Sequence, residues 1–319
     1  MTSTNHIEDL VRRIRGGEIR ALSRAISTVE DHTPESIALL KALFPYSGSA
    51  VLLGLTGSPG AGKSTLVDQV ARVYRKQGKT IGIVAVDPTS PFSGGAILGD
   101  RIRMSSHHAD AGIFIRSMAT RGSLGGLAST TADVATVLDA SGRDIVMIET
   151  VGVGQDEIDI VRLADVTIVV LVPGMGDDVQ TIKAGIMEIA DIFVINKADR
   201  DGAERVEREI RAMQSLATRD DRWTPPIVKT VASEGVGTKE LADAIAGYEA
   251  YLKKENLVLK KNVDNSQERL VEMLRDAMLE KARAQMDGGS LERYAAEIAE
   301  HKRDPYSLVE EIVGALRNT

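Results

Sequence analysis

A glycine-rich segment near residue 60 is the first stretch whose residue types and spacing could do chemistry. Residues 57–64 have the G-x-x-x-x-G-K-[ST] spacing of a phosphate-binding loop. Its glycines let successive main-chain N–H groups face a polyphosphate, its lysine reaches the β- and γ-phosphates, and its serine hydroxyl ligates Mg²⁺. The predicted nucleotide contacts here are Gly57, Ser58, Pro59, Gly60, Ala61, Gly62, Lys63, Ser64 and Thr65.

The residues on either side supply the strand and the helix that such a loop needs. Residues 51–55 form a short apolar run typical of a buried strand. Apolar residues then recur at helical spacing from Leu66 to Tyr74, and Gly78 stands where a helix would stop. We therefore expect the N-terminus of a helix to place its partial positive charge beneath the phosphates.

An acidic residue at the end of a later apolar run is a candidate metal ligand. The run 145–148 is followed by Glu149, and Gly152 comes three residues after that. In phosphate-loop enzymes an acid in this place holds the Mg²⁺ shell, and the glycine N–H senses the γ-phosphate. The usual acid is aspartate. Because glutamate is longer, Glu149 could bind the metal directly or through a water molecule.

A long segment rich in glycine, proline and serine spans residues 87–101. Loops that follow strand ends in α/β folds carry ligand contacts, and a solvated surface loop is the alternative. Arg101 or Arg103 could neutralise phosphate charge. The predicted metal ligands are Ser64, Asp87, Asp100 and Glu149, and the predicted catalytic residues are Lys63, Asp87, Asp100 and Glu149.

A third motif, Asn-Lys-Ala-Asp at residues 196–199, predicts which base is bound. The Asp199 carboxylate can accept hydrogen bonds from both N1–H and the 2-amino group of guanine, a donor pair that adenine lacks. Asn196 would brace neighbouring loops, and the Lys197 stem would cover the face of the base. These residues favour GTP over ATP. A weaker element, in which a main-chain N–H would meet guanine O6, consists of Val231, Ala232 and Ser233.

Two further segments bear on turnover. Small GTPases orient the attacking water with a glutamine directly after the glycine that senses the γ-phosphate. Here that glycine is Gly152, and Gln155 falls two residues too late for this role. We therefore predict slow hydrolysis by the chain alone, with a partner completing the site. The segment 173–185 combines glycines and acids before a predicted helix, which favours a moving segment. Asp177 or Asp178 could equally be a helix cap.

Strands and helices alternate through the middle of the chain. Apolar runs rich in valine and isoleucine predict strands buried on both faces of a mostly parallel sheet. They cover 51–56, 81–86, 145–149, 166–172, 191–196 and 227–231, and 113–117 is a possible addition. The predicted helices cover 65–77, 156–164, 178–189, 203–216 and 238–253. This alternation predicts an α/β fold of the P-loop NTPase type, a doubly wound sheet flanked by helices.

Helical patterns extend this central region at both ends. We predict an N-terminal helical extension (1–46), a GTPase domain (47–258) and a C-terminal helical arm (259–319). Apolar residues from Ile7 to Ile14 lie on one helical face, and Thr33-Pro34 predicts the start of a second helix. Residues 260–264 read as a polar junction, and Asp304-Pro305 predicts the start of a last helix.

Composition excludes several classes of function. The chain has 319 residues, a net charge of −7 and no cysteine. The acidic balance gives no support for a nucleic-acid partner, and no apolar run is long enough for a membrane span. Without cysteine, disulfides and thiolate metal sites are excluded, and the adjacent His107 and His108 are interpreted as solvated. The N-terminus lacks a signal-peptide pattern, so we expect a cytoplasmic location.

Taken together, these motifs resemble one family, the methylmalonyl-CoA mutase-associated GTPases called MeaB or ArgK, of the SIMIBI class of phosphate-loop proteins. The resemblance covers the central domain and extends toward both helical ends. Glu149 in place of aspartate is that family's own pattern. The residues that carry it are 57–65, 86–91, Gly94-Gly95, Gly99 to Arg103, 149–155, Pro173-Gly174, Asp177-Asp178, Gln180 and 196–199.

The resemblance implies properties that the residues alone do not. It implies a homodimer joined by the C-terminal helices, and a chaperone of an adenosylcobalamin-dependent acyl-CoA mutase that gates cofactor loading and protects the mutase. It implies Mg²⁺ and GTP or GDP as ligands, with no cobalamin bound directly, and a switch at residues 174–188. By position, the phosphate and metal residues would be Lys63, Asp87, Asp100 and Glu149.

Two other functions remain open on the sequence. One is an ATP-dependent kinase of a basic amino-acid transport system, an older assignment within the same family. The other is a nucleotide-gated scaffold with negligible turnover, which the displaced Gln155 favours.

Overall fold

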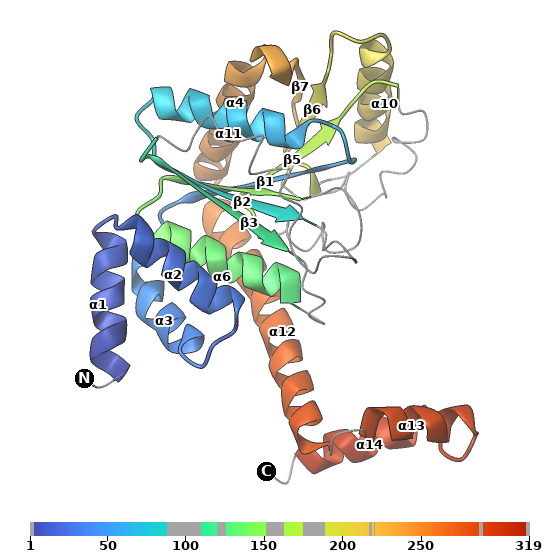
Figure 1. Cartoon of the computed structure of the whole chain (residues 1–319). Helices are drawn as coiled ribbons and strands as arrows, with labels where there is room; N and C mark the ends of the chain where they lie inside the picture. The colour runs from blue at the N-terminus through green and yellow to red at the C-terminus, as the bar shows by residue number, and fades with distance from the viewer. Residues whose placement is uncertain are drawn as a thin grey trace. The chain divides into compact units, whose positions relative to one another are not determined.

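The computed structural model describes residues 3–87, 110–119, 126–150, 163–174, 189–216, 219, 221–286 and 290–316. The chain divides into two compact units, residues 1–265 and 266–319. The first unit is a parallel sheet with helices on both faces (Figure 1).

The sheet has seven strands in the order β3-β2-β4-β1-β5-β6-β7, and every neighbouring pair is parallel. This confirms the predicted α/β fold, including the possible strand near residue 113. Parallel strands buried on both faces account for their nearly continuous apolar sequences. The strands are β1 Val51–Gly57, β2 Ile81–Asp87, β3 Ile113–Ala119, β4 Ile145–Glu149, β5 Val166–Leu171, β6 Ile192–Asn196 and β7 Ile227–Thr230.

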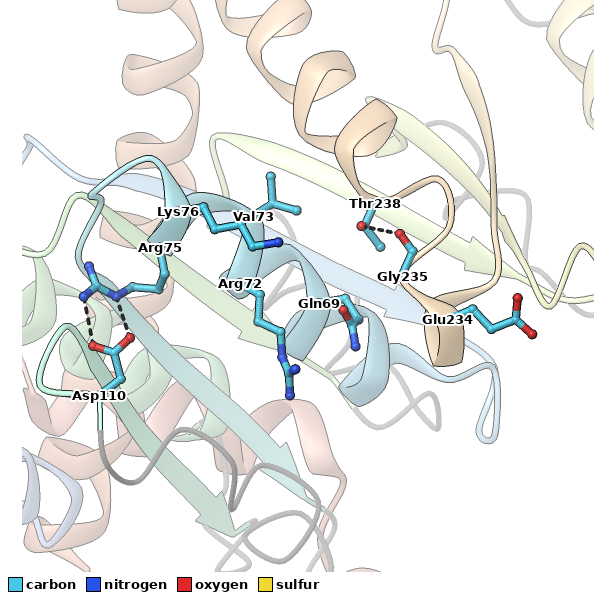
Figure 2. Close-up of a pocket in the computed structure, with 9 residues that line it drawn as sticks. All are labelled: Gln69, Arg72, Val73, Arg75, Lys76, Asp110, Glu234, Gly235 and Thr238. Atoms are coloured by element: carbon cyan, nitrogen blue, oxygen red, sulfur yellow. Dashed lines mark hydrogen bonds and ion pairs between the residues drawn. The ribbon is translucent and has the colours of Figure 1, made fainter.

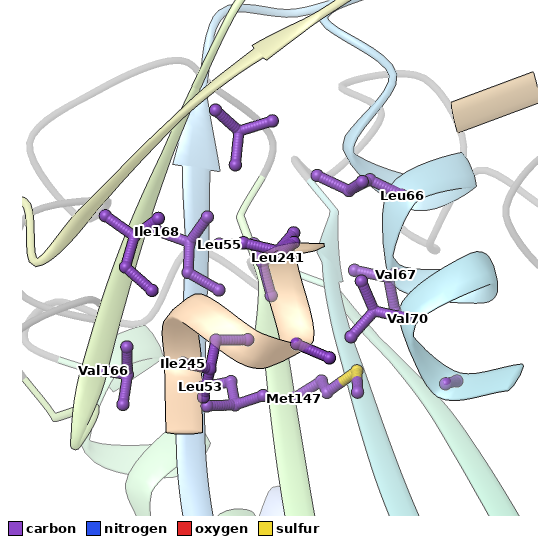
Figure 3. Packing of buried hydrophobic residues seen from close by; sticks show 14 of the residues in the cluster. Leu53, Leu55, Leu66, Val67, Val70, Met147, Val166, Ile168, Leu241 and Ile245 are labelled. Carbon is purple, nitrogen blue, oxygen red and sulfur yellow. The ribbon is translucent and has the colours of Figure 1, made fainter. Parts of the chain in front are cut away.

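One face of the sheet is covered by α4 (Lys63–Lys76) and α11 (Thr238–Lys254). Figure 3 shows how strand residues such as Leu53 and Ile168 meet Val67 from α4 and Ile245 from α11. The predicted stop of α4 is confirmed, because Gly78 adopts a left-handed φ of 79° immediately after the helix. α10 (Ala203–Leu216) packs on β5 and β6 in a smaller cluster of its own.

The opposite face carries α6 (Gly126–Ala140) and the N-terminal helices (Figure 1). The predicted helices do not include residues 126–140, where threonine, valine and serine have modest helix propensity. Burial decides the outcome: Val134, Ala135 and Leu138 are at most 1% exposed between the sheet and the N-terminal helices.

Three helices, rather than two, precede the sheet: α1 (Ser3–Arg15), α2 (Ile19–Glu30) and α3 (Ser36–Leu43). The helix predicted to start at Thr33-Pro34 corresponds to α3, which starts at Ser36, so that prediction is wrong in position. The Thr33 hydroxyl donates to the carbonyl of Thr28 at 3.4 Å, so this residue closes the end of α2 instead of capping α3.

The C-terminal region is also more helical than predicted. α12 (Val258–Gln285) runs through residues 260–264, so the predicted polar junction is wrong. These polar residues form helix because most of them are exposed, where lysine and asparagine are tolerated. α13 (Ser290–Ala299) and α14 (Pro305–Leu316) follow. The start of α14 is confirmed, with the Asp304 carboxylate accepting the N–H of Ser307 at 2.9 Å.

Some predicted elements fall on residues that the structure does not describe. The predicted helix 156–164 lies outside the described ranges except for its last two residues, and 178–189 except for its last residue. The three-part division of the chain at residues 46 and 258 stays a prediction. Within the described ranges, no helix is both long enough and apolar enough to span a membrane.

Candidate nucleotide site

The carboxyl ends of parallel strands bring the predicted motifs to one edge of the sheet. Gly57 ends β1, Glu149 ends β4, Asn196 ends β6 and Thr230 ends β7. The strand β1 lies between β4 and β5, where chain connections leave in opposite directions. Ligands of open α/β sheets bind at such an edge.

Two positions in the loop between β1 and α4 require glycine. Gly57 has a φ of 140°, and a Cβ there would lie 2.1 Å from the carbonyl oxygen of Val170. Gly62 has a φ of 86°, and its Cβ would lie 2.5 Å from the Asn196 side-chain nitrogen. With Gly62 as the N-cap, α4 starts at Lys63, so the first amides of the helix face the loop.

The Lys63 side chain folds back over this loop. Its ammonium group donates to the carbonyl of Gly57 and, at 3.1 Å, to that of Ser58. The residue is only 5% exposed. Both carbonyls belong to the predicted phosphate cradle, so a buried cation lies where phosphate charge is expected.

Ser64 and Glu149 form the second part of the site. The Ser64 hydroxyl donates to a Glu149 carboxylate oxygen at 2.6 Å, and Glu149 is 6% exposed. The pairing of β1 with β4 places Leu55 opposite Glu149, which sets this contact. A hydroxyl beside a buried carboxylate is the hard-oxygen donor set that Mg²⁺ prefers, so these two residues fit the predicted metal.

The remaining predicted metal ligands are only partly described. Asp87 ends β2 on the same edge, and its side chain lies outside the described part of the chain, as does Asp100. Over the residues that the structure describes, no group of three or more histidine, aspartate or glutamate side chains gathers as a metal site would. The four-residue metal set stays a prediction, with Ser64 and Glu149 as its described part.

Asn196 joins the phosphate loop to the end of β7. It is 2% exposed, and its side-chain nitrogen donates to the carbonyl of Ala61 at 2.8 Å. Its side-chain oxygen accepts from the Thr230 hydroxyl at 3.0 Å and from the N–H of Ala232 at 3.1 Å. One buried amide therefore holds together three segments that are far apart in sequence.

The neighbours of Asn196 extend over the same loop. Lys197 has a left-handed φ of 56°, and its ammonium group donates to the carbonyl of Gly60 at 2.7 Å. Asp199 follows in a turn and is exposed. In the segment after β7, the N–H of Val231 donates to Val236 at 3.1 Å. The Asp199 carboxylate is therefore exposed to a ligand, whereas the Lys197 side chain is held against the phosphate loop.

Sequence reasoning missed Thr230, which is fully buried. We expect Thr230→Val to weaken GTP binding about fivefold, because losing one buried hydrogen bond to Asn196 costs about 1 kcal/mol. Titration calorimetry measures this. Thr238→Val is the matched control, since that hydroxyl belongs to a residue that is also buried but donates to Gly235. Equal losses of GTP affinity in both variants would contradict a specific role for Thr230.

A cavity of about 500 Å³ lies along the flank of α4, away from the start of that helix (Figure 2). Both arginines that line it pair within the protein: Arg75 binds Asp110 through two hydrogen bonds of 2.9 Å, and Arg72 pairs with Asp68 at 3.0 Å. Because these cations are already engaged, we assign the cavity no role in the site.

Other predicted functional residues lie outside the described ranges. They are Asp100, Arg101, Arg103, Gln155 and residues 175–188 of the predicted switch. His107 and His108, which the sequence led us to interpret as solvated, also lie outside these ranges.

Residues 22–287 match the family model described as methylmalonyl Co-A mutase-associated GTPase MeaB. A putative GTPase of Pyrococcus abyssi is 46% identical over 315 residues, 97% of each chain. The GTPase ArgK of Escherichia coli is 38% identical over 254 residues, 77% of each chain.

A solved structure agrees with these sequence matches. A crystal structure of an LAO/AO transport system kinase superposes with a TM-score of 0.72 at 26% identity and covers 99% of both chains. The architecture described above is therefore shared over the full length of that protein.

Proposed function

The chain belongs to the MeaB family of GTPases, and on that premise we propose that it is a Mg²⁺-dependent GTP hydrolase that serves as a switch for an adenosylcobalamin-dependent acyl-CoA mutase. The observation that carries the proposal is the double attachment of Asn196 to the phosphate loop and to the segment after β7. This attachment ties a predicted guanine site to a predicted triphosphate site.

Phosphate binding follows from the start of α4. The amides of the first helical turn and the Lys63 ammonium group would surround the β- and γ-phosphates and hold their charge. Ser64 and Glu149 would hold Mg²⁺, which would supply positive charge against the phosphates when bound. Preorganised positive groups that face developing charge are the main source of catalysis in phosphoryl transfer.

Guanine selection would fall to two groups. The exposed Asp199 carboxylate would accept from N1–H and the 2-amino group. The amides of Val231 and Ala232 already donate within the protein, so we assign the predicted contact with guanine O6 to the N–H of Ser233. Because each contact is specific to guanine, ATP would be rejected.

The proposed partner is the mutase that the family description names. We infer that this chain gates cofactor loading and protects the mutase without binding cobalamin itself, and that hydrolysis is slow until the partner completes the site. A homodimer is proposed through the second unit, where Leu270, Leu274 and Met278 are each more than half exposed on α12. A monomeric mass in solution would contradict the dimer.

The test is GTP turnover with and without a purified adenosylcobalamin-dependent acyl-CoA mutase. We expect slow hydrolysis by the chain alone and a rate at least about tenfold higher with the mutase, since a partner that completes a GTPase site can raise the rate by about 10³–10⁵-fold. Single-turnover measurements of the chain alone separate slow hydrolysis from a scaffold without turnover. GTP binding without any change of rate on adding the mutase would contradict the switch.

The kinase alternative rests on the structural similarity to the LAO/AO transport system kinase. It predicts ATP binding and a phosphorylated acceptor protein. If ATP competes with GTP at equal concentration and phosphate appears on a protein, the kinase assignment is correct. We favour the GTPase because the exposed Asp199 carboxylate, the proposed base contact, suits the donor pair of guanine and not adenine.

A further inference from the structure

A cluster of charged side chains around the buried Asp191 lies at the amino end of β6, at the opposite end of that strand from Asn196. Asp191 is 2% exposed, and its carboxylate accepts from Lys261 at 2.8 Å and from Arg219 at 3.1 Å. Arg219 also pairs with Asp221 at 2.7 Å. Two cations thus surround Asp191, so that its buried carboxylate is paired, whereas the side chains of Arg219, Asp221 and Lys261 are partly exposed.

The same carboxylate sets the register of two strands. Asp191 accepts the N–H of Thr167 at 2.9 Å through its side chain and donates its own N–H to the Thr167 carbonyl at 2.9 Å. Thr167 lies in β5, which leads to Gly174 and the predicted switch segment. Asp191 precedes β6, which leads to Asn196. One side chain therefore anchors two neighbouring strands, β5 and β6, that run toward the nucleotide edge.

Lys261 brings the first turns of α12 to this anchor. Besides Asp191, its ammonium group donates to the Tyr248 hydroxyl at 2.9 Å and lies 4.7 Å from the centre of that ring. Burial raises the pKa of Tyr248, and Asp191 raises it further, so the hydroxyl stays protonated. Burial also raises the pKa of Asp165, and Lys261 opposes that rise. The position of Lys261 thus stabilises several carboxylates at once.

We propose that the Asp191 cluster couples the nucleotide site to residues 258–264, so that guanine-nucleotide binding and attachment of this first part of α12 to the sheet stabilise each other. All five residues of β6 are buried. Because protein interiors are close-packed, a displacement at one end of β6 is transmitted to its other end. Coupling between two binding events is reciprocal, so each event stabilises the other. The proposal deepens the proposed function and rests on it, because it requires that guanine nucleotide binds at the edge described above.

The chain carries its own reporter of this cluster. Trp223 is the only tryptophan. Its indole N–H donates to the Asp191 carbonyl at 2.8 Å, and its ring lies 5.1 Å from that of Tyr248 and 4.9 Å from that of Tyr251. We expect GDP to change the emission or the acrylamide quenching of Trp223 in the wild-type protein, and no change would overturn the proposal.

The decisive comparison is Lys261→Met against Lys260→Met. The two lysines are adjacent and lose the same charge, but Lys260 is exposed and Lys261 is bound to Asp191. GDP affinity by calorimetry is expected to fall about fivefold or more in Lys261→Met, the lower end of coupling between sites, and to stay unchanged in Lys260→Met. The response of Trp223 to GDP should also disappear in Lys261→Met alone.

Wild-type GDP affinity in Lys261→Met would overturn the coupling. It would leave the proposed function intact, whereas a wild-type protein that binds no GDP would contradict the proposed function itself. If Lys261→Met fails to fold, Tyr248→Phe replaces it, because that change removes one acceptor and keeps the ring beside Trp223. A loss of GDP affinity of about twofold to threefold is then expected, because the change weakens one hydrogen bond. Unchanged GDP affinity in Tyr248→Phe would overturn the proposal.

Discussion

Lys63→Ala is expected to lower the affinity for GTP about 30-fold or more. The ammonium group lies against the carbonyls of Gly57 and Ser58 on a residue that is 5% exposed, so phosphate would meet it away from bulk water. Removing one member of a buried charge pair costs about 2–5 kcal/mol, and each 1.4 kcal/mol is about tenfold in affinity. Calorimetric titration with GTP and Mg²⁺ measures the loss directly.

The control for this variant is Lys76→Ala at the other end of α4. Lys76 is exposed, so the same change of charge on the same helix should leave GTP affinity within about twofold, as is usual for surface substitutions. Circular dichroism verifies that both variants fold. Tight GTP binding by folded Lys63→Ala would reject the phosphate site assigned to the start of α4.

Asp199→Asn is expected to change the preferred base. Guanine presents N1–H and a 2-amino group, two donors that suit a carboxylate. Xanthine presents N1–H and a carbonyl at position 2, so an amide side chain can accept from one and donate to the other. Because a site built around polar partners rejects an analogue that leaves them unpaired, we expect GTP affinity to fall on the order of 100-fold or more and xanthosine triphosphate affinity to rise.

Competition between GTP and xanthosine triphosphate measures this exchange. Asp201→Asn is the matched control, because Asp201 is an exposed acid two residues further along the same turn. It should keep the preference for GTP. An unchanged base preference in Asp199→Asn would show that guanine is recognised elsewhere, and the assignment of Ser233 to O6 would fall with it.

The two predictions address different ends of one ligand, and Asn196 connects them. Its contact with Ala61 reaches the phosphate loop, and its contacts with Thr230 and Ala232 reach the segment that we propose lies beside the base. We therefore expect the effects of Thr230→Val to be smaller than those of Lys63→Ala or Asp199→Asn, since the former removes support and the latter remove direct contacts. The Lys261 variant acts from further away, through β6.

Much of this protein could be predicted from the order of its residues. The phosphate loop, the acid at the end of β4 and the Asn-Lys-x-Asp motif are local patterns whose spacing reflects the geometry of the ligand. The phosphate loop with its flanking strand and helix could be recognised first, and the other two became informative because they follow it at strand ends. The apolar runs predicted the parallel sheet, because strands buried on both faces have no polar side. The Asp304-Pro305 cap was also readable, since its hydrogen bonds lie within three residues.

Other features depended on contacts between distant residues. α6 has a composition of modest helix propensity and forms because it is buried between the sheet and the N-terminal helices. Thr33 resembled a cap, but its hydroxyl bonds backward to Thr28. The roles of Thr230 and Lys261 come from partners 34 and 70 residues away, and no local pattern encodes such distances. Sequence alone determined which chemical groups this protein brings to a nucleotide, because those groups follow the ligand. The tertiary structure decided which buried residues hold them in place, because such partners meet only when the chain is packed.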